Sequence, residues 1–391
     1  MRLSRSLLVA CLSAFVVVGL AVPVVSAGRS TPTTRYVDDD GRGSLNGCSG
    51  QATIASSIQS AVDLSTSGDR ILVCPGVYVG TVTISNLGGL SIRAVDMWKA
   101  IVRPATDHSN NSPLLLAVNS PGTEISRLRL EARTTLPCDN VGAMIAINNS
   151  AGALVADNRV TASGSDSLGA CGYDTGVSMY SSPNSIVERN FVVNFQQYGL
   201  DVYESSNAKL RDNRIQFFHS QSGSTAATGV GILLNSGATG VRVMRNRIRA
   251  LTSAGTTSPR LELGIALNST PAIVRDNELR YVDEAVRLLS VTGGARVRSN
   301  TAVESVGFGV RLYYSDDNLI ADNTLAAGSR SLWAESDSTG NTFSGNDADG
   351  PADPDCEDQS SGTGTALTGN IWTGNSGTSA PVGICVPATG T

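Results

Sequence analysis

Residues 155–160 read Val-Ala-Asp-Asn-Arg-Val, and the same pattern returns as Leu-Arg-Asp-Asn-Arg-Ile at 210–215, Val-Arg-Asp-Asn-Glu-Leu at 274–279 and Ile-Ala-Asp-Asn-Thr-Leu at 320–325. An asparagine between polar residues, with an aliphatic residue on each side, is typical of a strand that enters and leaves a bend. This asparagine recurs at intervals of 23 or 24 residues, or of 31 to 33 where residues are inserted. The nine positions are Asn158, Asn190, Asn213, Asn246, Asn277, Asn300, Asn323, Asn346 and Asn370.

A second strand precedes each asparagine by some fourteen residues and usually begins at a glycine, as at Gly199 and Gly231. Two or three short strands cannot bury an apolar face alone, so the repeats must stack as the coils of a solenoid. Asparagine suits the bend because it tolerates left-handed backbone angles and its amide can bond the equivalent amide one coil away. A helical repeat is the alternative, but Val, Ile and Thr beside Gly and Asn disfavour helix. The repeat therefore predicts an all-β parallel β-helix.

The repeat resembles the right-handed parallel β-helix proteins of the pectin-lyase-like superfamily, and the resemblance covers roughly residues 35–385. The opening stretch is similar as well, with Tyr-Val-Asp at 36–38, a candidate helix at 53–63 and Gly-Asp-Arg-Ile-Leu-Val-Cys-Pro-Gly-Val-Tyr at 68–78. The resemblance implies a single-stranded right-handed coil. We expect the helix to cover the first coil, because an open sheet edge invites aggregation.

The first residues are typical of a secretory signal. Arg2 and Arg5 precede an apolar run at 7–20 and small residues at 25–27. We expect a signal peptide at 1–27, an N-terminal cap and first coil at 28–80, β-helix repeats at 81–346 and a C-terminal coil and cap at 347–391. The predicted product is a secreted bacterial protein, extracellular or associated with the cell surface, with no membrane segment after the signal is removed.

The mature chain would hold an even number of cysteines, which favours disulfides in a secreted protein. The six are Cys48, Cys74, Cys138, Cys171, Cys356 and Cys385. Six cysteines allow fifteen connectivities, and their places in the repeat favour one of them, which consists of three pairs. Cys48 and Cys74 bracket the N-terminal helix, Cys138 and Cys171 fall at the same corner of adjacent coils, and Cys356 and Cys385 bracket a C-terminal cap that contains Trp372. No pair has the close spacing of a zinc site.

The net charge of −5 predicts that no basic stripe is available for nucleic acid. Continuous repeats favour one domain, and we expect a monomer. A Ser-His-Asp hydrolase is disfavoured, because His108 and His219 are the only histidines and neither accompanies a Gly-x-Ser-x-Gly turn.

Counted from the leading glycine, successive residues of each coil alternate between the core and the outside. Two inward columns are predicted: Val177, Leu200, Ile232, Ile265, Val286 and Val310, then Met179, Val202, Leu234, Leu267, Leu288 and Leu312. The outward columns contain Ser178, Tyr180, Asp201, Tyr203, Asn235, Arg287, Arg311, Tyr313, Trp333 and Glu335. Aromatic rings on a flat sheet can stack on sugars, and arginine can pair with a uronate carboxylate. Outward positions on any β-helix also favour such residues, simply through β-propensity.

Four insertions follow the asparagine strand, at 131–140, 161–175, 218–230 and 251–263. They all project from one corner, so they predict a wall beside this outward face and a cleft between wall and face.

Within that cleft, Tyr-Gly-Leu-Asp-Val-Tyr-Glu at 198–204 resembles the alginate C5-epimerase signature Tyr-Gly-x-Asp-Pro-His-Asp. Tyr198, Gly199 and Asp201 match, whereas Val202, Tyr203 and Glu204 depart from it. We predict Asp201 and Arg311 as catalytic residues. The predicted substrate-binding residues are Tyr180, Tyr203, Glu204, Arg287 and Tyr313. By comparison with pectate lyases, Asp174, Asp201 and Glu204 are candidate calcium ligands, with Arg287 or Arg311 as the base.

Two functions follow. The first is a polysaccharide lyase or glycoside hydrolase that binds and cleaves a uronate-containing glycan, with calcium as the one cofactor considered. The second is a non-catalytic extracellular scaffold or adhesion module, because no complete catalytic signature is present.

Overall fold

The computed structural model describes residues 31–41, 48, 55–105, 112–132, 142–162, 174–195, 197–218, 229–251, 261–305, 307–348, 350–351 and 354–386. The chain divides into two compact units, 1–31 and 32–391, and all described residues except Thr31 belong to the second. The predicted signal peptide, His108, His219 and the cysteines Cys138 and Cys171 lie outside the described residues.

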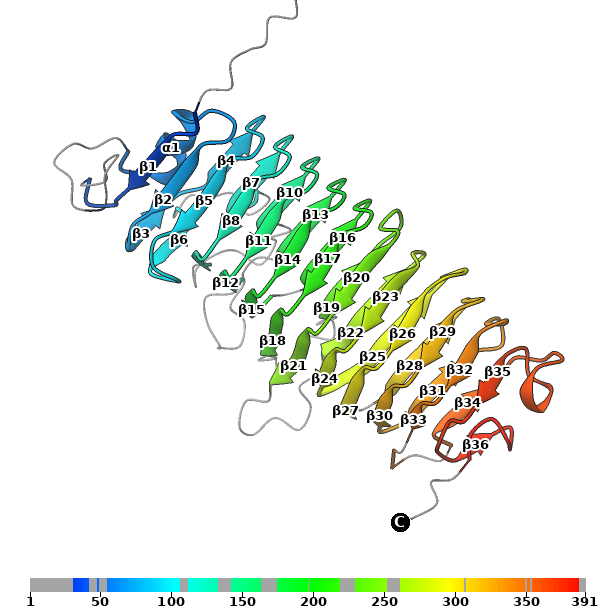
Figure 1. Cartoon of the computed structure of the whole chain (residues 1–391). Coiled ribbons are helices and arrows are strands. Elements are labelled where there is room, and N and C mark those ends of the chain that lie inside the picture. The colour runs from blue at the N-terminus through cyan, green and yellow to red at the C-terminus, as the bar shows by residue number, and fades with distance from the viewer. Residues whose placement is uncertain are drawn as a thin grey trace, which may run out of the picture. The chain divides into compact units, whose positions relative to one another are not determined.

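Within the described ranges, 36 short strands form three parallel sheets, whose successive strands lie side by side in Figure 1. Sheet A contains β1 (Thr34–Val37), β2 (Arg70–Val73), β5 (Ser91–Ala94), β8 (Glu124–Ser126), β11 (Leu154–Ala156), β14 (Ile186–Glu188), β17 (Lys209–Arg211), β20 (Val241–Met244), β23 (Ala272–Arg275), β26 (Arg296–Arg298), β29 (Leu319–Ala321), β32 (Thr342–Ser344) and β35 (Ile371–Thr373). Sheet B contains β3 (Gly76–Val79), β6 (Ala100–Arg103), β9 (Arg129–Glu131), β12 (Arg159–Thr161), β15 (Phe191–Val193), β18 (Arg214–Phe218), β21 (Arg247–Leu251), β24 (Glu278–Arg280), β27 (Thr301–Ser305), β30 (Thr324–Ala327) and β33 (Asp347–Ala348). Sheet C contains β4 (Val82–Ser85), β7 (Leu115–Val118), β10 (Ala143–Asn148), β13 (Thr175–Tyr180), β16 (Tyr198–Tyr203), β19 (Val230–Leu234), β22 (Leu261–Asn268), β25 (Val282–Leu289), β28 (Phe308–Tyr313), β31 (Arg330–Ala334), β34 (Cys356–Asp358) and β36 (Ser379–Ala380).

Each coil runs from sheet C to sheet A to sheet B, as β16, β17 and β18 do, and then enters the next coil. This is a parallel β-helix, as predicted. Both predicted inward columns are confirmed. For example, Leu200 pairs with Val177 and Ile232 on the neighbouring strands, and all three side chains are buried. The core is therefore a continuous stack of aliphatic side chains between the sheets.

The repeated asparagine occupies the corner between sheets A and B. The Asn213 amide nitrogen donates to Asn246 Oδ1 at 3.0 Å, and Asn246 donates in the same way to Asn277. This ladder ends at Asn375, which receives the amide of Asn346 at 2.8 Å. The prediction of Asn370 as the ninth member is therefore wrong, because Asn370 closes a second, shorter ladder that begins at Asn318 and Asn341 at the corner between sheets C and A.

The left-handed backbone position of the A–B corner lies one residue earlier than predicted. Asp212 and Arg245, which precede ladder asparagines, have φ angles of 58° and 53°. The asparagine itself is buried and holds the bend with its side-chain amide. The predicted local bonding between coils is thus confirmed, but the strained conformation is carried by the outward residue before it.

Both ends of the solenoid are covered. The predicted helix at 53–63 is shorter in the structure, where α1 spans Ile58–Asp63, because Ser57 and Ser60 form a capping box at its start. Its buried residues, Ile58, Ala61 and Val62, lie in the common core, and α1 contacts β1, β2 and β4.

At the C-terminal end a short 3₁₀ turn (η1, Thr365–Leu367) precedes β35, and Trp372 in β35 stacks on Phe343 with ring centroids 3.8 Å apart. Disulfides join Cys48 to Cys74 and Cys356 to Cys385, as predicted. Such bonds are typical of proteins that fold in an oxidising compartment.

Candidate functional site

The outward face of sheet C has the register that the sequence predicts. Asp201 lies between Ser178 and Leu233 in one column, and Tyr203 lies beside Tyr180 in the next. Further along, Arg311 lies between Arg287 and Trp333. The predicted site residues therefore share one face.

A third outward column, which the sequence reasoning missed, lies before the leading glycine. Its members are Thr175, Tyr198, Val230, Leu263, Glu284, Phe308 and Arg330. The glycine explains it: a Cβ on Gly231 would stand 2.6 Å from the Gly264 carbonyl oxygen and 2.7 Å from Ile248. The strand backbone packs closely against the neighbouring strand at the glycine. The alternation of inward and outward side chains therefore holds for the residues after the glycine but not for the residue before it.

A titratable cluster occupies the N-terminal half of the face. Asp201 is half-buried in β16, and Asn235 Nδ2 donates to its carboxylate at 3.1 Å. Burial raises the pKa of Asp201 to about 6, against the lowering effect of the hydrogen bonds from Asn235 and from the Val202 backbone. Burial likewise raises the pKa of Asp174 to about 6. Burial, with the charges of Asp201 and Asp174, also raises the pKa of Tyr198.

Two tyrosines form a platform beside Asp201. The rings of Tyr180 and Tyr203 are nearly parallel at 6°, with centroids 5.3 Å apart, and Tyr180 is 43% exposed. Glu204 follows Tyr203 in a left-handed conformation and accepts a hydrogen bond from Ser181 Oγ at 2.8 Å. The structure thus brings together four of the predicted site residues, namely Tyr180, Asp201, Tyr203 and Glu204.

The C-terminal half of the face is an ion-pair network. Arg311 donates to Glu284 at 2.9 Å and to Glu335 at 2.8 Å, and its guanidinium lies 4.4 Å from the centroid of the Trp333 ring. Arg287 donates to Glu284 at 2.6 Å. Tyr313 packs edge-on against Tyr314. Both predicted arginines are therefore already paired with carboxylates of the chain itself.

This pairing bears on the predicted role of Arg311 as a base. Burial acts to lower the pKa of Arg311, but the hydrogen bonds and charges of Glu335 and Glu284 outweigh it, so the pKa is raised. A raised pKa holds the proton on the guanidinium, which disfavours proton abstraction.

The predicted catalytic pair is also divided between the two halves. Asp201 is in β16 and Arg311 is in β28, with β19, β22 and β25 between them. At about 4.8 Å per strand, four steps place the two residues roughly 19 Å apart. They cannot act on one bond of a substrate.

Metal-ligand spacing occurs at another place. Among the described residues, Asp38, Cys48 and Cys74 are the one group of three with ligand atoms within 4.8 Å of one another, and the two sulfurs are joined in a disulfide. Asp174, Asp201 and Glu204 do not meet that criterion. The four predicted insertions lie largely outside the described residues, so the predicted wall of the cleft stays a prediction.

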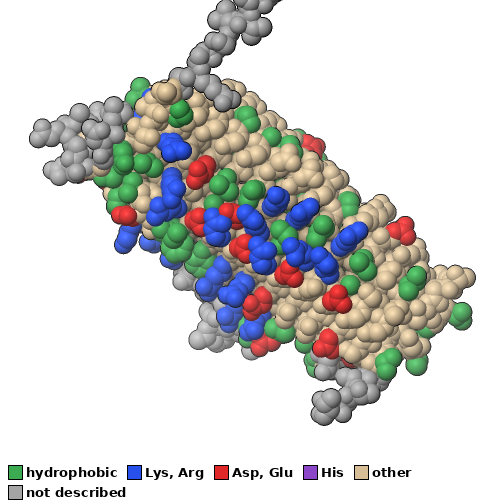
Figure 2. Space-filling model, viewed as in Figure 1, with side chains coloured by type: hydrophobic (Ala, Val, Ile, Leu, Met, Phe, Trp, Pro, Cys, Tyr) green, Lys and Arg blue, Asp and Glu red, His purple; other side chains and the backbone are tan. Residues whose placement is uncertain are grey.

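A different face carries a basic stripe, and here the sequence prediction that none exists is wrong. Figure 2 shows Lys and Arg side chains gathered over the middle coils of the face formed by sheets A and B. The prediction was wrong because the net charge is a sum over the whole chain, whereas the β-helix places many of the cationic residues on neighbouring strands of the same two sheets.

No helix in the described part of the chain has the length and apolar character required to cross a bilayer.

Two family profiles match the chain. The family described as "Right handed beta helix region" matches residues 53–258, which is more than half of the 391 residues. The family described as "Periplasmic copper-binding protein (NosD)" matches residues 227–383. That second range contains no histidine, Met244 is its single methionine, and its one cysteine, Cys356, is in a disulfide. These residues do not fit a copper site, because residues 227–383 contain no imidazole and no free thiolate that could bind the metal.

Similar solved structures share the fold at low identity. The Dettilon tailspike protein is 14% identical with a TM-score of 0.62, over 82% of this chain and 63% of its own, so this chain spans less than two thirds of the tailspike. The A-module of the mannuronan C-5 epimerase AlgE6 from Azotobacter vinelandii is 11% identical with a TM-score of 0.54, over 83% of this chain and 94% of its own. An exopolygalacturonase from Thermotoga maritima is 12% identical with a TM-score of 0.54, over 72% and 79%.

No curated protein sequence matches the chain significantly. The three stacked sheets and the profile match over more than half of the residues agree with the predicted resemblance to the pectin-lyase-like superfamily. The chain belongs to the right-handed β-helix family.

Proposed function

We propose that this protein is a secreted polysaccharide-acting β-helix protein that holds a glycan chain across β13, β16 and β19 of sheet C. The observation that carries the proposal is Asp201, a half-buried carboxyl group on an outward column, beside the Tyr180–Tyr203 platform. Support comes from two structural relatives, which are named as a mannuronan C-5 epimerase and an exopolygalacturonase. The two disulfides and the predicted signal at 1–27 support export to an oxidising compartment.

The chemistry proposed for Asp201 is proton transfer. With a pKa of about 6, the carboxyl group is partly protonated near neutral pH and can give a proton to a glycosidic oxygen or accept one. Hydrolysis also needs a group that activates water, normally a carboxyl group about 5–9.5 Å from the acid. The β13–β16 register places Asp174 four residues, roughly 13 Å, along the strands from Asp201, so we assign Asp174 to substrate binding and not to that role. Tyr198 lies close enough to be influenced by both charges and would position the sugar between them.

Charge constrains the glycan that this site would accept. Asp174, Asp201 and Glu204 make the site acidic, and Arg287 and Arg311 are occupied by Glu284 and Glu335. A neutral sugar would bind without further help. A uronate chain would need a cation such as calcium between its carboxylates and those of the protein.

The test is incubation of residues 28–391 with neutral and uronate-rich polysaccharides, with and without calcium, followed by analysis of reducing-end and unsaturated products. We expect reducing-end products, and we expect Asp201→Asn to lower the rate by at least about a hundredfold, since one acid–base group contributes typically 10²–10⁴. Asp96→Asn is the matched control, because Asp96 is exposed and distant in the sequence.

Unsaturated products would instead assign a lyase. Binding without any product, weakened by Tyr203→Ala, would assign the non-catalytic binding module. Turnover that is unchanged in Asp201→Asn would refute the proposed role of this carboxyl group.

A further inference from the structure

The basic stripe on sheets A and B consists of eleven cationic side chains in four consecutive coils, from β17–β18 to β26. We name it the arginine face. Its members are Lys209, Arg211, Arg214, Arg242, Arg245, Arg247, Arg249, Arg275, Arg280, Arg296 and Arg298. The same strands and their corners contain three acidic residues, Asp212, Asp276 and Glu278. This surface is thus strongly positive although the whole chain has a net charge of −5.

One coil shows how the sequence builds this face. Between positions 242 and 249, Val243, Asn246 and Ile248 are buried, while the four arginines Arg242, Arg245, Arg247 and Arg249 are all exposed. The alternation of the strands and the left-handed turn at Arg245 direct every guanidinium group outward.

Sheet pairing places like charges directly opposite one another at four points of the arginine face. The opposed pairs on neighbouring strands are Lys209 with Arg242, Arg214 with Arg247, Arg249 with Arg280, and Arg275 with Arg298. Like charges in such positions destabilise a sheet, so a folding role does not explain them. A bound polyanion would convert each repulsive pair into a favourable site.

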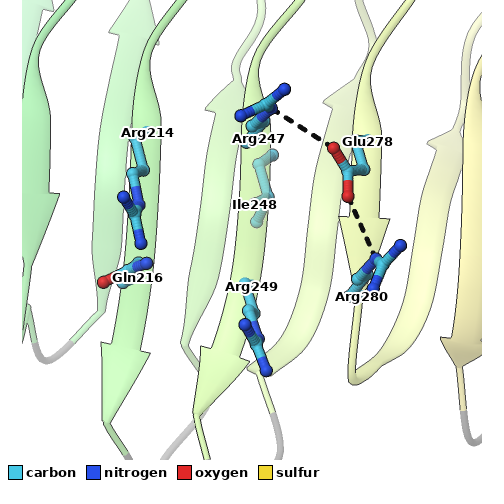
Figure 3. A pocket seen from close by; sticks show the side chains of 7 residues that line it. All are labelled: Arg214, Gln216, Arg247, Ile248, Arg249, Glu278 and Arg280. Carbon is cyan, nitrogen blue, oxygen red and sulfur yellow. Dashed lines mark ion pairs between the residues drawn. The ribbon is translucent and has the colours of Figure 1, made fainter.

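The acidic residues neutralise only part of this charge. Arg245 makes a bidentate pair with Asp212, with both contacts at 2.8 Å. Glu278 is shared by Arg247 at 3.3 Å and Arg280 at 3.0 Å, as Figure 3 shows. Among the residues that the structure describes, no carboxylate lies within ion-pair distance of the exposed Arg242, Arg249, Arg296 and Arg298.

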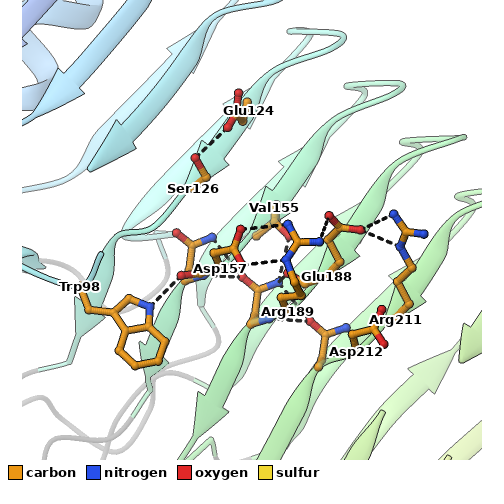
Figure 4. Close-up of polar contacts among 12 residues, drawn as sticks. Trp98, Glu124, Ser126, Val155, Asp157, Glu188, Arg189, Arg211 and Asp212 are labelled. Carbon is orange, nitrogen blue, oxygen red and sulfur yellow. Dashed lines mark hydrogen bonds and ion pairs between the residues drawn. The ribbon is translucent and has the colours of Figure 1, made fainter. Parts of the chain in front are cut away.

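The preceding coils provide a contrast. There Arg189 makes a bidentate pair with Asp157 at 2.8 and 2.9 Å, and Glu188 pairs with both Arg189 and Arg211, as Figure 4 shows. The corner pair itself recurs in the arginine face as Arg245 with Asp212. The contrast therefore lies in the flanking strands, where the exposed Arg242, Arg249, Arg296 and Arg298 have no ion-pair partner among the described residues.

The surface relief fits an extended ligand. A hollow of about 300 Å³ is lined by the arginines Arg214, Arg247, Arg249 and Arg280 and by one carboxylate, Glu278. It shares Arg214, Arg247 and Glu278 with a second hollow at the A–B corner, where Asp212 and Asp276 balance the arginines, so the excess positive charge lies in the first hollow. Both hollows are open and lie along the same run of strands. A linear polymer that lies across these strands would contact arginine guanidinium groups on successive coils, which are about 4.8 Å apart.

We propose that the arginine face binds an anionic polysaccharide chain that runs across β17 to β26. Guanidinium groups match carboxylates in planar, bidentate geometry, so a polyuronate is the chemistry that fits. A nucleic acid is disfavoured, because the disulfides indicate an oxidising compartment and the rings of Phe191 and Tyr281 are already covered by Arg214 and Arg249. The inference is independent of the proposed function, since sheets A and B are distinct from the site on sheet C.

The test compares three forms of residues 28–391 for binding to polygalacturonate, dextran sulfate and duplex DNA at 50 and 200 mM salt. The forms are the wild type, the double variant Arg242→Gln/Arg249→Gln, and the control Arg70→Gln/Arg93→Gln. The control removes the same charge from exposed positions on β2 and β5 of sheet A. Because Arg242 and Arg249 have no carboxylate partner within the described ranges of the chain, we expect the double variant to fold with unchanged or raised thermal stability.

We expect polygalacturonate to bind the wild type, with affinity that falls as salt rises, and to bind the double variant roughly tenfold more weakly. The control should bind like the wild type, which ties the loss to the arginine face and not to the removal of two positive charges as such. Dextran sulfate binding as tightly as polygalacturonate would still support an anionic polysaccharide, with sulfate in place of carboxylate. No binding, equal loss in both double variants, or tighter binding of DNA would overturn the inference.

Discussion

Replacing Asp201 with asparagine removes a carboxyl group whose ionised form the fold disfavours. Its pKa is about 6 in the folded protein against 3.8 for the free group, chiefly because it is buried on the outward face of β16. For a raised pKa, the stabilising contribution is fully present below the unfolded value and is lost as the pH rises through the folded value. This difference in pKa corresponds to about 3 kcal/mol as an upper bound, since a tenfold change in an equilibrium constant is about 1.4 kcal/mol.

Asp201→Asn should therefore stabilise the protein at pH 8 by up to about 3 kcal/mol and have little effect at pH 4. Asparagine keeps an oxygen that can accept the hydrogen bond from Asn235, so the contact itself survives. Urea midpoints of the wild type, Asp201→Asn and the exposed control Asp96→Asn, recorded from pH 4 to pH 8, measure the effect. An unchanged or lowered midpoint at pH 8, or a gain that is equal at both pH values, would refute this reasoning. Higher stability with lost turnover would mark Asp201 as a residue kept for function.

Three further predictions concern the fold. Asn246→Ala should destabilise the protein by about 3–5 kcal/mol, because the buried side-chain amide donates hydrogen bonds to Leu210 and Asn277 and accepts one from Asn213. The control Asn268→Ala, on the outward face, should cost under about 1 kcal/mol, and equal denaturant midpoints for the two variants would contradict the ladder's role. Gly231→Ala should cost about 1–3 kcal/mol through its contacts with Gly264 and Ile248, and a variant as stable as the wild type in thermal denaturation would show that the strands can separate freely there. Replacing Cys356 and Cys385 with alanine should expose the C-terminal cap to limited proteolysis while the rest of the solenoid keeps its circular dichroism; cooperative loss of all β-structure would mean that the cap holds the whole fold.

Most of the fold could be predicted from the sequence because a solenoid repeats one local solution. The spacing of Asn213, Asn246 and Asn277 fixes the register of each coil, and the residues that follow each glycine then divide into core and surface. The ladder was predicted wrongly at its C-terminal end, where the local sequence offers two asparagines for one position. Asn370 and Asn375 both stand near the expected interval, and only the three-dimensional stacking assigns them to different ladders.

The candidate site was harder to predict from the sequence. The repeat shows which residues share a face of the sheet, but it does not show which of them form ion pairs or hydrogen bonds. Arg311 was rightly placed outward, yet its partner Glu284 lies in a column that the glycine rule did not reach. The raised pKa of Asp201 depends on burial among neighbouring coils, which no sequence spacing expresses. The arginine face was hidden for the same reason, since only pairing between strands places Arg249 opposite Arg280.

The most direct test of the proposed glycan site is the structure of the protein with an oligosaccharide from the polysaccharide panel bound. We expect a sugar ring on the Tyr180–Tyr203 platform and a glycosidic oxygen within hydrogen-bond distance of Asp201. An oligosaccharide bound elsewhere, with this platform and Asp201 open to solvent, would contradict the assignment of sheet C as the functional face.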